Sequence, residues 1–123
     1  IAPDQAPPLN PTARKRMVDR AREYALSHLD EPLSILDLCN HIGASRRKLQ
    51  YCFQETLGIN PVAYLRALRL NAVRRELRTS TQAHGVQAVA ARWGFWHLSR
   101  FSSDYRTMFG ESPSQTLRRT QLC

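Results

Sequence analysis

The sequence predicts an all-α fold in which a long helix joins two helix-turn-helix subdomains. The main observation is an internal duplication: residues 45–61 read SRRKLQYCFQETLGINP, and residues 98–113 read LSRFSSDYRTMFGESP. Each copy has three apolar residues four apart, then glycine, a polar residue and proline: Leu49, Phe53, Leu57, Gly58, Asn60, Pro61, and Phe101, Tyr105, Phe109, Gly110, Ser112, Pro113. Apolar residues four apart share a helix face, glycine suits a left-handed helix end, and proline suits the next helix start. The second observation is an apolar-periodic segment, 61–78, between the copies.

The chain divides into four predicted segments. Residues 1–12 carry four prolines and no apolar periodicity, which is typical of a linker, with a tail as the alternative. We expect residues 13–60 to form the first helix-turn-helix subdomain, 61–79 the linker helix, and 80–123 the second subdomain. Because the sequence begins with Ile1 and not Met, we expect a fragment whose N-terminal domain is missing.

Three helices are predicted in the first subdomain. A helix over 13–29 has Thr12 as its N-cap and one apolar face, formed by Met17, Ala21, Tyr24, Ala25 and Leu29. The second helix follows Ser34, which forms a capping box with Asp37, and it ends at Gly43. Its buried stripe contains Ile35, Leu38, Cys39 and Ile42. A short turn then leads into the third helix, which completes a helix-turn-helix.

The linker helix carries an apolar stripe wide enough to contact both subdomains: Val62, Leu65, Leu68, Leu70, Val73 and Leu77. Its length is about 27 Å at 1.5 Å per residue. That length is comparable with the roughly 34 Å between successive major-groove faces of duplex DNA. The second subdomain repeats the helix-turn-helix with Val86, Val89, Ala90 and Trp93, a slightly longer turn, and a last helix beginning at Ser112-Pro113.

The net positive charge of the chain favours a polyanionic partner, and the composition gives little support to any other class of function. The net charge of +8 is uneven, since residues 1–45 hold five basic and six acidic side chains and residues 46–123 hold thirteen and four. Arginine dominates, and its forked donors suit phosphate and guanine. No segment approaches the roughly 18 apolar residues of a membrane span, and no signal peptide pattern is present. The three cysteines lack metal-site spacing, and no catalytic constellation stands out, so we expect no metal, no cofactor and no enzyme activity.

The third helix presents a polar outer face that is predicted to read DNA. With Leu49, Cys52, Phe53 and Thr56 inward, the outward residues are Arg46, Arg47, Gln50, Tyr51 and Gln54. Arginine pairs with guanine and glutamine with adenine, so Arg47, Gln50 and Tyr51 are expected on bases. Arg46 and Lys48 in the first turn, beside Ser45, are expected on the phosphate backbone. A solvated charged face is the alternative interpretation.

The equivalent helix of the second subdomain is expected to discriminate bases less strongly. It exposes His97, Ser99, Arg100, Ser102, Ser103 and Arg106. Serine pairs with several bases, so Arg100 is the expected base reader and Arg106 a phosphate contact. Trp96 is expected to be buried at the edge of the core, the alternative being contact with a thymine methyl group.

These segments resemble the AraC/XylS family of bacterial transcription regulators. The resemblance rests on EPLSILDLCNHIGASRRKLQYCFQETLGINPVAYL, RLNAVRREL and GFWHLSRFSSDYRTMFGESP, and it covers residues 14–119. It implies a seven-helix DNA-binding domain, an N-terminal effector-sensing or dimerisation domain, a cytoplasmic location and, in many members, activation through contact with RNA polymerase.

Two other functions compete with sequence-specific regulation. One is a non-specific or architectural nucleic-acid binder that uses charge alone, with a steep salt dependence and no preferred sequence. The other is a module that binds an acidic protein partner. Charge alone does not require two helix-turn-helix units, so sequence-specific binding of double-stranded DNA is the favoured prediction.

Overall fold

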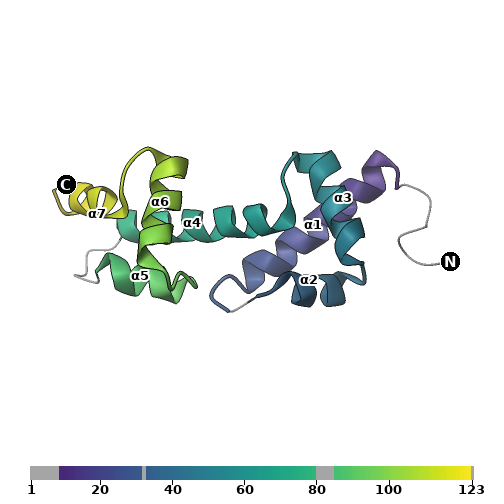
Figure 1. The fold of residues 1–123 in the computed structure, drawn as a ribbon, viewed down its shortest axis with the longest axis horizontal. Helices are drawn as coiled ribbons and strands as arrows, with labels where there is room; N and C mark the ends of the chain where they lie inside the picture. The colour runs from purple at the N-terminus through teal and green to yellow at the C-terminus, as the bar shows by residue number, and fades with distance from the viewer. Residues whose placement is uncertain (1–8, 32, 80–84, 123) are drawn as a thin grey trace. The chain divides into compact units, whose positions relative to one another are not determined.

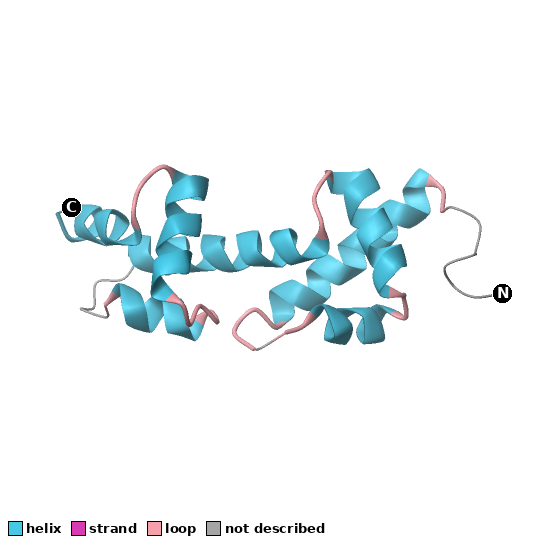
Figure 2. Ribbon diagram, in the orientation of Figure 1, coloured by secondary structure: helices cyan, strands magenta, loops and turns pink. Residues whose placement is uncertain are grey.

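A computed structural model describes residues 9–31, 33–79 and 85–122, and in these residues the only regular elements are seven α-helices (Figures 1 and 2). The helices are α1 Pro11–Ser27, α2 Ile35–Ile42, α3 Arg46–Leu57, α4 Pro61–Thr79, α5 Val86–Arg92, α6 Leu98–Phe109 and α7 Pro113–Leu122. The predicted all-α fold with seven helices is therefore confirmed. Most of the proline-rich segment 1–12 and of the loop after α4 lies outside the described residues.

The chain folds as two compact units, residues 1–66 and residues 67–123. The first unit contains α1, α2, α3 and the first turns of α4, and the second contains the rest of α4 with α5, α6 and α7. Each unit therefore holds one complete helix-turn-helix.

The first helix starts earlier than predicted. Asn10, not Thr12, is the N-cap of α1: its side-chain oxygen accepts a hydrogen bond of 2.8 Å from the amide of Ala13, and Pro11 occupies the first helical position. An Asn-Pro pair also opens α4, where the Asn60 side chain accepts from the Ala63 amide at 2.8 Å. The Asn-Pro pair is the stronger helix start because proline already has the helical φ and needs no donor.

The core of the first unit lies between α1, α2 and α3. Its buried apolar side chains are Val18, Ala21, Ala25, Leu29, Leu38, Cys39, Ile42, Leu49, Cys52, Phe53 and Leu65. The predicted α1 face is therefore rotated slightly, with Val18 at its centre and Met17 and Tyr24 half-buried at its edge. Leu57, predicted to continue the buried stripe of α3, is 43% exposed because α3 ends there.

The start of α2 and the turn between α2 and α3 have the local geometry that the sequence predicts. The hydroxyl of Ser34 accepts from the Asp37 amide at 3.0 Å and the Asp37 carboxylate accepts from the Ser34 amide at 3.1 Å, so the capping box is present. Gly43 ends α2 with φ of 70°, in the left-handed region that favours glycine. Residues 43–45 then connect the two helices.

The second unit is built around two aromatic rings of α6. Its core contains Leu70, Val73, Leu77, Val89, Ala90, Phe101 and Tyr105. The end of α5 is held by the carboxylate of Glu76 in α4. That carboxylate accepts from Arg92 at 2.8 Å and from the Trp93 indole at 3.2 Å. Residues 93–97 connect α5 to α6, a longer turn than 43–45, as predicted.

Val62, predicted in the apolar stripe of α4, is 48% exposed because Pro61 and Leu65 take the inward positions in the first turn of that helix.

Candidate nucleic-acid interface

The outer face of α3 is polar and exposed, and the opposite face of the same helix is apolar and buried. Its backing residues Leu49, Cys52 and Phe53 are buried, whereas the outward residues are exposed as predicted: Arg46, Arg47, Gln50, Tyr51 and Gln54. Lys48 is half-buried. Ser45 is also half-buried and is the N-cap, since its hydroxyl accepts from the Lys48 amide at 3.0 Å. Ser45 therefore orients the helix, and its hydroxyl is already engaged there.

Tyr51 does not stand alone on this face, because Arg14 from α1 lies beside it. The guanidinium of Arg14 is 3.4 Å from the Tyr51 hydroxyl and 5.8 Å from the centre of its ring, and it also donates to the carbonyl of Leu9 at 2.7 Å. The apolar face predicted for this helix indicates how it packs but gives no sign that Arg14 contacts Tyr51. The i, i+3 and i+4 pattern of α1 could not reveal it, because the contact spans 37 residues.

A groove runs alongside α3 within the first unit. Arg46 and Gln50 form part of its wall, and the start of α4 forms another part with Pro61, Val62 and Arg66. Its volume is about 290 Å³. The groove places guanidinium groups from α3 and α4 at one surface, where the free amides of a helix start and positive side chains favour an anion.

The outer face of α6 carries fewer long side chains. His97, Ser99, Arg100, Ser103 and Arg106 are exposed, whereas Ser102 is half-buried. His97 precedes the first residue of α6 and its side chain makes no capping hydrogen bond. Serine side chains are short, so Arg100 and Arg106 are the residues that extend furthest from this helix.

The prediction that Trp96 is buried is wrong, because this residue is 76% exposed. Phe95 takes the inward position instead, with its ring 5.0 Å from that of Phe101 and packed against the core of the second unit. Consecutive residues in an extended turn point to opposite sides, so burying Phe95 directs Trp96 outward. An exposed indole therefore stands immediately before α6, next to His97 and Leu98.

Cys39 and Cys52 belong to the core rather than to a site. Burial raises the pKa of the Cys39 and Cys52 thiols, an effect that Arg46 and Lys48 respectively oppose. The Cys52 sulfur lies 3.5 Å from that of Met17. Among the described residues no three histidine, cysteine or acidic side chains are grouped as metal ligands. Within that same part of the chain, no helix is both long and apolar enough to cross a membrane.

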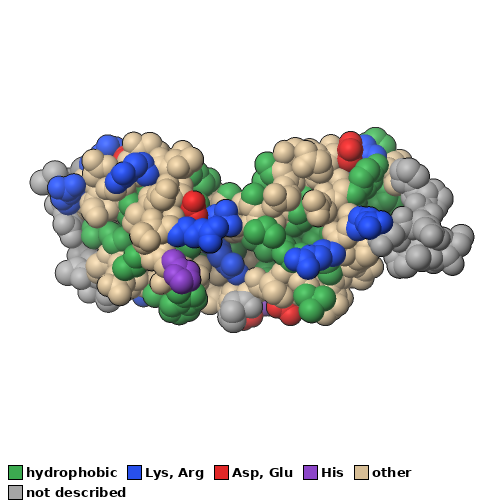
Figure 3. Space-filling model, viewed as in Figure 1, with side chains coloured by type: hydrophobic (Ala, Val, Ile, Leu, Met, Phe, Trp, Pro, Cys, Tyr) green, Lys and Arg blue, Asp and Glu red, His purple; other side chains and the backbone are tan. Residues whose placement is uncertain are grey.

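Basic side chains form several patches on the surface drawn in Figure 3, and hydrophobic and other uncharged surface lies between them. The first unit carries nine basic and seven acidic residues, and the second carries nine and three. The helices of the two units define a protein of the helix-turn-helix class. The exposed faces of α3 and α6, together with this charge, give it a surface suited to a polyanion.

Comparison with known proteins agrees with that class. Residues 38–119 match the model of a helix-turn-helix domain. The probable thc operon regulatory protein of Rhodococcus erythropolis is 38% identical over 103 residues, which are 83% of this chain and 31% of that protein. The XylDLEGF operon transcriptional activator 3 of Pseudomonas putida is 31% identical over 105 residues, which are 85% of this chain and 32% of that protein. The chain thus spans about a third of the length of these relatives.

Two solved structures are similar over most of the chain. A probable AraC family transcriptional regulator from Rhodopseudomonas palustris CGA009 has a TM-score of 0.81 at 34% identity, covering 86% of this chain and 98% of that one. The DNA-binding domain of AdpA, a global transcriptional factor solved in complex with a target DNA, has a TM-score of 0.75 at 26% identity, covering 86% and 93%. The chain belongs to the AraC/XylS family, whose members are DNA-binding transcription regulators and not enzymes.

Proposed function

We propose that this chain is the sequence-specific, double-stranded DNA-binding domain of a bacterial transcriptional activator. The observation that carries the proposal is the outer face of α3, where exposed arginine, glutamine and tyrosine side chains stand on a capped helix with a buried apolar back. Such a helix fits the major groove, and its side chains have the donors and acceptors that read base edges.

The residues of the first unit take two roles in this proposal. Arg47, Gln50 and Tyr51 contact bases, and Gln54 extends the same face by one turn. Arg46 and Lys48 contact phosphates from the first turn of α3, where the helix start adds a favourable field. Arg14 holds Tyr51 from the side, so the orientation of the phenol is set before DNA arrives.

The second unit contributes grip and a smaller share of base reading. Arg100 contacts a base, Arg106 contacts a phosphate, and His97, Ser99 and Ser103 supply short polar contacts. In this proposal each helix enters a major groove, and the two boxes that the units recognise lie about one DNA turn apart. The net charge of the second unit, six positive charges, favours the phosphate backbone irrespective of sequence.

The remainder of the activator lies outside this sequence in our proposal. The named relatives are about three times as long as the segment that matches, which supports a separate effector-sensing or dimerisation domain. Several relatives are known as transcriptional activators, which supports contact with RNA polymerase and a cytoplasmic location.

Selection of bound duplexes from a random DNA library, at near-physiological salt, tests the proposal. We expect a recovered motif of two boxes about one helical turn apart, the first more sharply defined than the second. One box with a featureless flank would assign sequence reading to the first unit alone.

Two outcomes would contradict sequence-specific binding. Salt-sensitive binding without any motif would identify a non-specific nucleic-acid binder, the competing function that the uneven charge favours. Affinity for duplex DNA no better than roughly millimolar would fall below ordinary non-specific binding and favour an acidic protein partner.

A further inference from the structure

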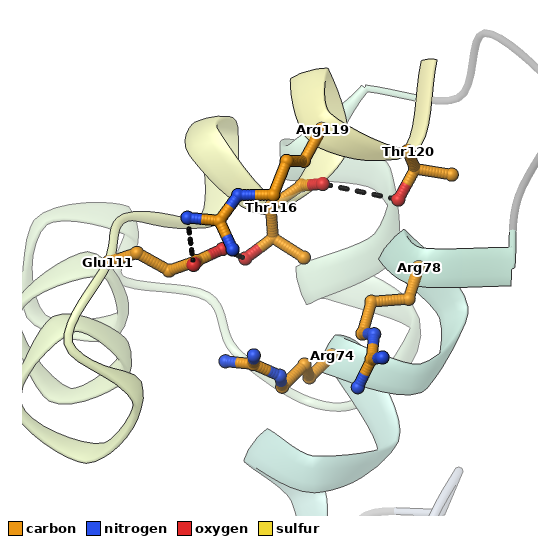
Figure 4. Close-up of a pocket in the computed structure, with 6 residues that line it drawn as sticks. All are labelled: Arg74, Arg78, Glu111, Thr116, Arg119 and Thr120. Carbon is orange, nitrogen blue, oxygen red and sulfur yellow. Dashed lines mark hydrogen bonds and ion pairs between the residues drawn. The ribbon is translucent and has the colours of Figure 1, made fainter. Parts of the chain in front are cut away.

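A pocket in the second unit brings together three arginines that base reading does not use. Figure 4 shows Arg74 and Arg78 extending into it from successive turns of α4, opposite Arg119 of α7. The other lining residues are Glu111, Thr116 and Thr120, and the volume is about 340 Å³. This volume falls at the lower end of the range for small-molecule sites.

The single carboxylate of the pocket is already committed. Glu111 pairs with Arg119 at 2.9 Å and also accepts a hydrogen bond from the Thr116 hydroxyl. That hydrogen bond has the largest effect and lowers the pKa of Glu111, burial raises it by a smaller amount, and Arg119, Arg74 and Arg78 each lower it further. Glu111 is therefore ionised at neutral pH, and its carboxylate mainly neutralises the guanidinium of Arg119.

Arg74 and Arg78 are left with excess positive charge. Three arginines and one glutamate give the pocket a net charge of +2. Nη1 of Arg74 is buried and has no hydrogen-bond partner among the described residues. Two neighbouring guanidinium groups repel one another, and a buried unpaired donor costs free energy. The repulsion falls when an anion with several acceptor oxygens enters.

The pocket also holds its donors in place before any anion arrives. The guanidinium of Arg74 lies over the ring of Phe109 at 4.6 Å from its centre. The Thr116 hydroxyl is linked to the buried Tyr105 hydroxyl at 2.8 Å, and Thr120 donates to the Thr116 carbonyl at 3.2 Å. Fixed donors lose little freedom on binding, which favours a ligand that matches them.

We propose that the pocket formed by Arg74, Arg78 and Arg119 binds a phosphoryl group. Arginine forks match the paired oxygens of phosphate, and three forks around one cavity suit a tetrahedral phosphoryl group better than a single flat carboxylate. The phosphoryl group comes either from the DNA backbone or from a free phosphorylated small molecule. The residues that line this site are not among those on the outer faces of α3 and α6.

Titration of the ¹⁵N-labelled chain with inorganic phosphate, followed by NMR at constant ionic strength with chloride, tests the proposal. We expect saturable shifts of the Thr116 and Thr120 amides and of the side-chain Nε signals of Arg74, Arg78 and Arg119. Arg78→Gln should weaken phosphate binding about tenfold, because one charged hydrogen-bonding partner is lost. Arg78 is exposed, so this variant should fold.

Arg75→Gln is the matched control, because Arg75 is an exposed α4 arginine that does not line the pocket. It removes the same charge, and phosphate affinity should stay at the wild-type value. Non-saturating shifts that are equal in wild type, Arg78→Gln and Arg75→Gln would overturn the proposal and identify the cluster as an internal ion network. Acetate binding as tightly as phosphate would also overturn it, in favour of a carboxylate partner.

A second arm separates the two sources of the phosphoryl group. If the DNA backbone occupies the pocket, saturating duplex DNA should suppress the phosphate shifts, and Arg78→Gln should reduce the salt slope of DNA binding by about 0.9. If a free phosphorylated molecule occupies it, the phosphate shifts should persist with DNA present and the salt slope should stay unchanged. Failure of DNA binding itself would count against the proposed function only, since the phosphate titration needs no DNA.

Discussion

Tyr51 and Arg14 show how the exposed polar surface at α3 extends beyond one helix. Tyr51 has the polar tip and apolar ring that suit contact with a base edge, but its hydroxyl is held 3.4 Å from the guanidinium of Arg14. Since Arg14 also donates to the carbonyl of Leu9, the pair ties the start of α1 to the outer face of α3. Arg14 therefore adds positive charge to this face without occupying a position on α3.

Arg47 is the residue at which sequence-specific reading is most directly tested. Its side chain is exposed in the first turn of α3, where the proposed complex brings it within reach of base edges. Arg47→Ala should weaken binding to the selected duplex by about 1–3 kcal/mol, because a bidentate pair with guanine is lost. Fluorescence anisotropy with the selected and a scrambled duplex measures both losses.

Arg22→Ala provides the control for this measurement, because Arg22 is an exposed arginine of α1 that carries the same charge. It should leave discrimination between the two duplexes unchanged. Equal losses on selected and scrambled DNA in Arg47→Ala would assign Arg47 to the phosphate backbone.

Two aromatic residues five positions apart should respond in opposite ways to truncation. Phe101 is 1% exposed in the core of the second unit, whereas Trp96 is 76% exposed. Phe101→Ala should lower the free energy of unfolding by about 3–5 kcal/mol, and Trp96→Ala should change it by less than about 0.5 kcal/mol. Urea unfolding followed by circular dichroism measures both. A large loss in Trp96→Ala would contradict the exposure of the indole.

Single residues are where prediction from the sequence stops. Helical periodicity correctly placed Leu49, Cys52 and Phe53 inside, because it reports which face a residue occupies. It could not place Trp96, since that residue lies in a turn where the neighbouring Phe95 competes for the same core position. It could not find Arg14 either, because the Arg14–Tyr51 contact depends on tertiary packing.

Helix ends were the most predictable elements of the chain. Gly43, Gly58 and Gly110 all take positive φ at the ends of α2, α3 and α6, as their position after the last apolar residue predicts. The N-cap of α1 was misplaced from Asn10 to Thr12, since threonine is also a good cap. Local chemistry thus determines where a helix can begin, and the choice among nearby caps depends on the chain around them.

The capping box of α2 makes a pH-dependent prediction at the scale of an element. Hydrogen bonds from Ser34 lower the pKa of Asp37 below its ordinary value of 3.8. The ionised carboxylate therefore stabilises the folded chain above about pH 4, and this contribution is lost as the pH falls through the lowered pKa. Asp37→Asn should be less stable than wild type at pH 7, and the difference should shrink as the pH approaches 3.

Ser34→Ala separates the cap from the charge. It removes the hydroxyl acceptor and should cost about 1 kcal/mol at pH 7. Most of this loss should persist near pH 3, because the Ser34 amide lowers the pKa of Asp37 more than the Ser34 side chain does. Asp19→Asn is the control for charge alone, since Asp19 pairs with Lys15 on an exposed surface. Urea unfolding at the two pH values measures these differences, and a pH-independent loss in Asp37→Asn would contradict the capping assignment.

At the scale of the whole chain, charge and base-reading chemistry are distributed differently between the two units. The first unit has a net charge of +2 and carries the glutamines and tyrosine of α3, whereas the second has a net charge of +6 and short serines on α6. This division favours a first unit that selects sequence and a second unit that supplies much of the salt-sensitive affinity.

The salt dependence of DNA binding tests that division. Arg106, exposed on α6, is assigned to a phosphate, so Arg106→Ala should weaken selected and scrambled duplexes about equally. It should also reduce the slope of log K against log salt by about 0.9, the value for one released counterion. Arg47→Ala should lower affinity for the selected duplex while leaving that slope nearer to wild type. A slope change confined to the selected duplex in Arg106→Ala would instead assign Arg106 to base reading, and the second unit would then share in choosing the sequence.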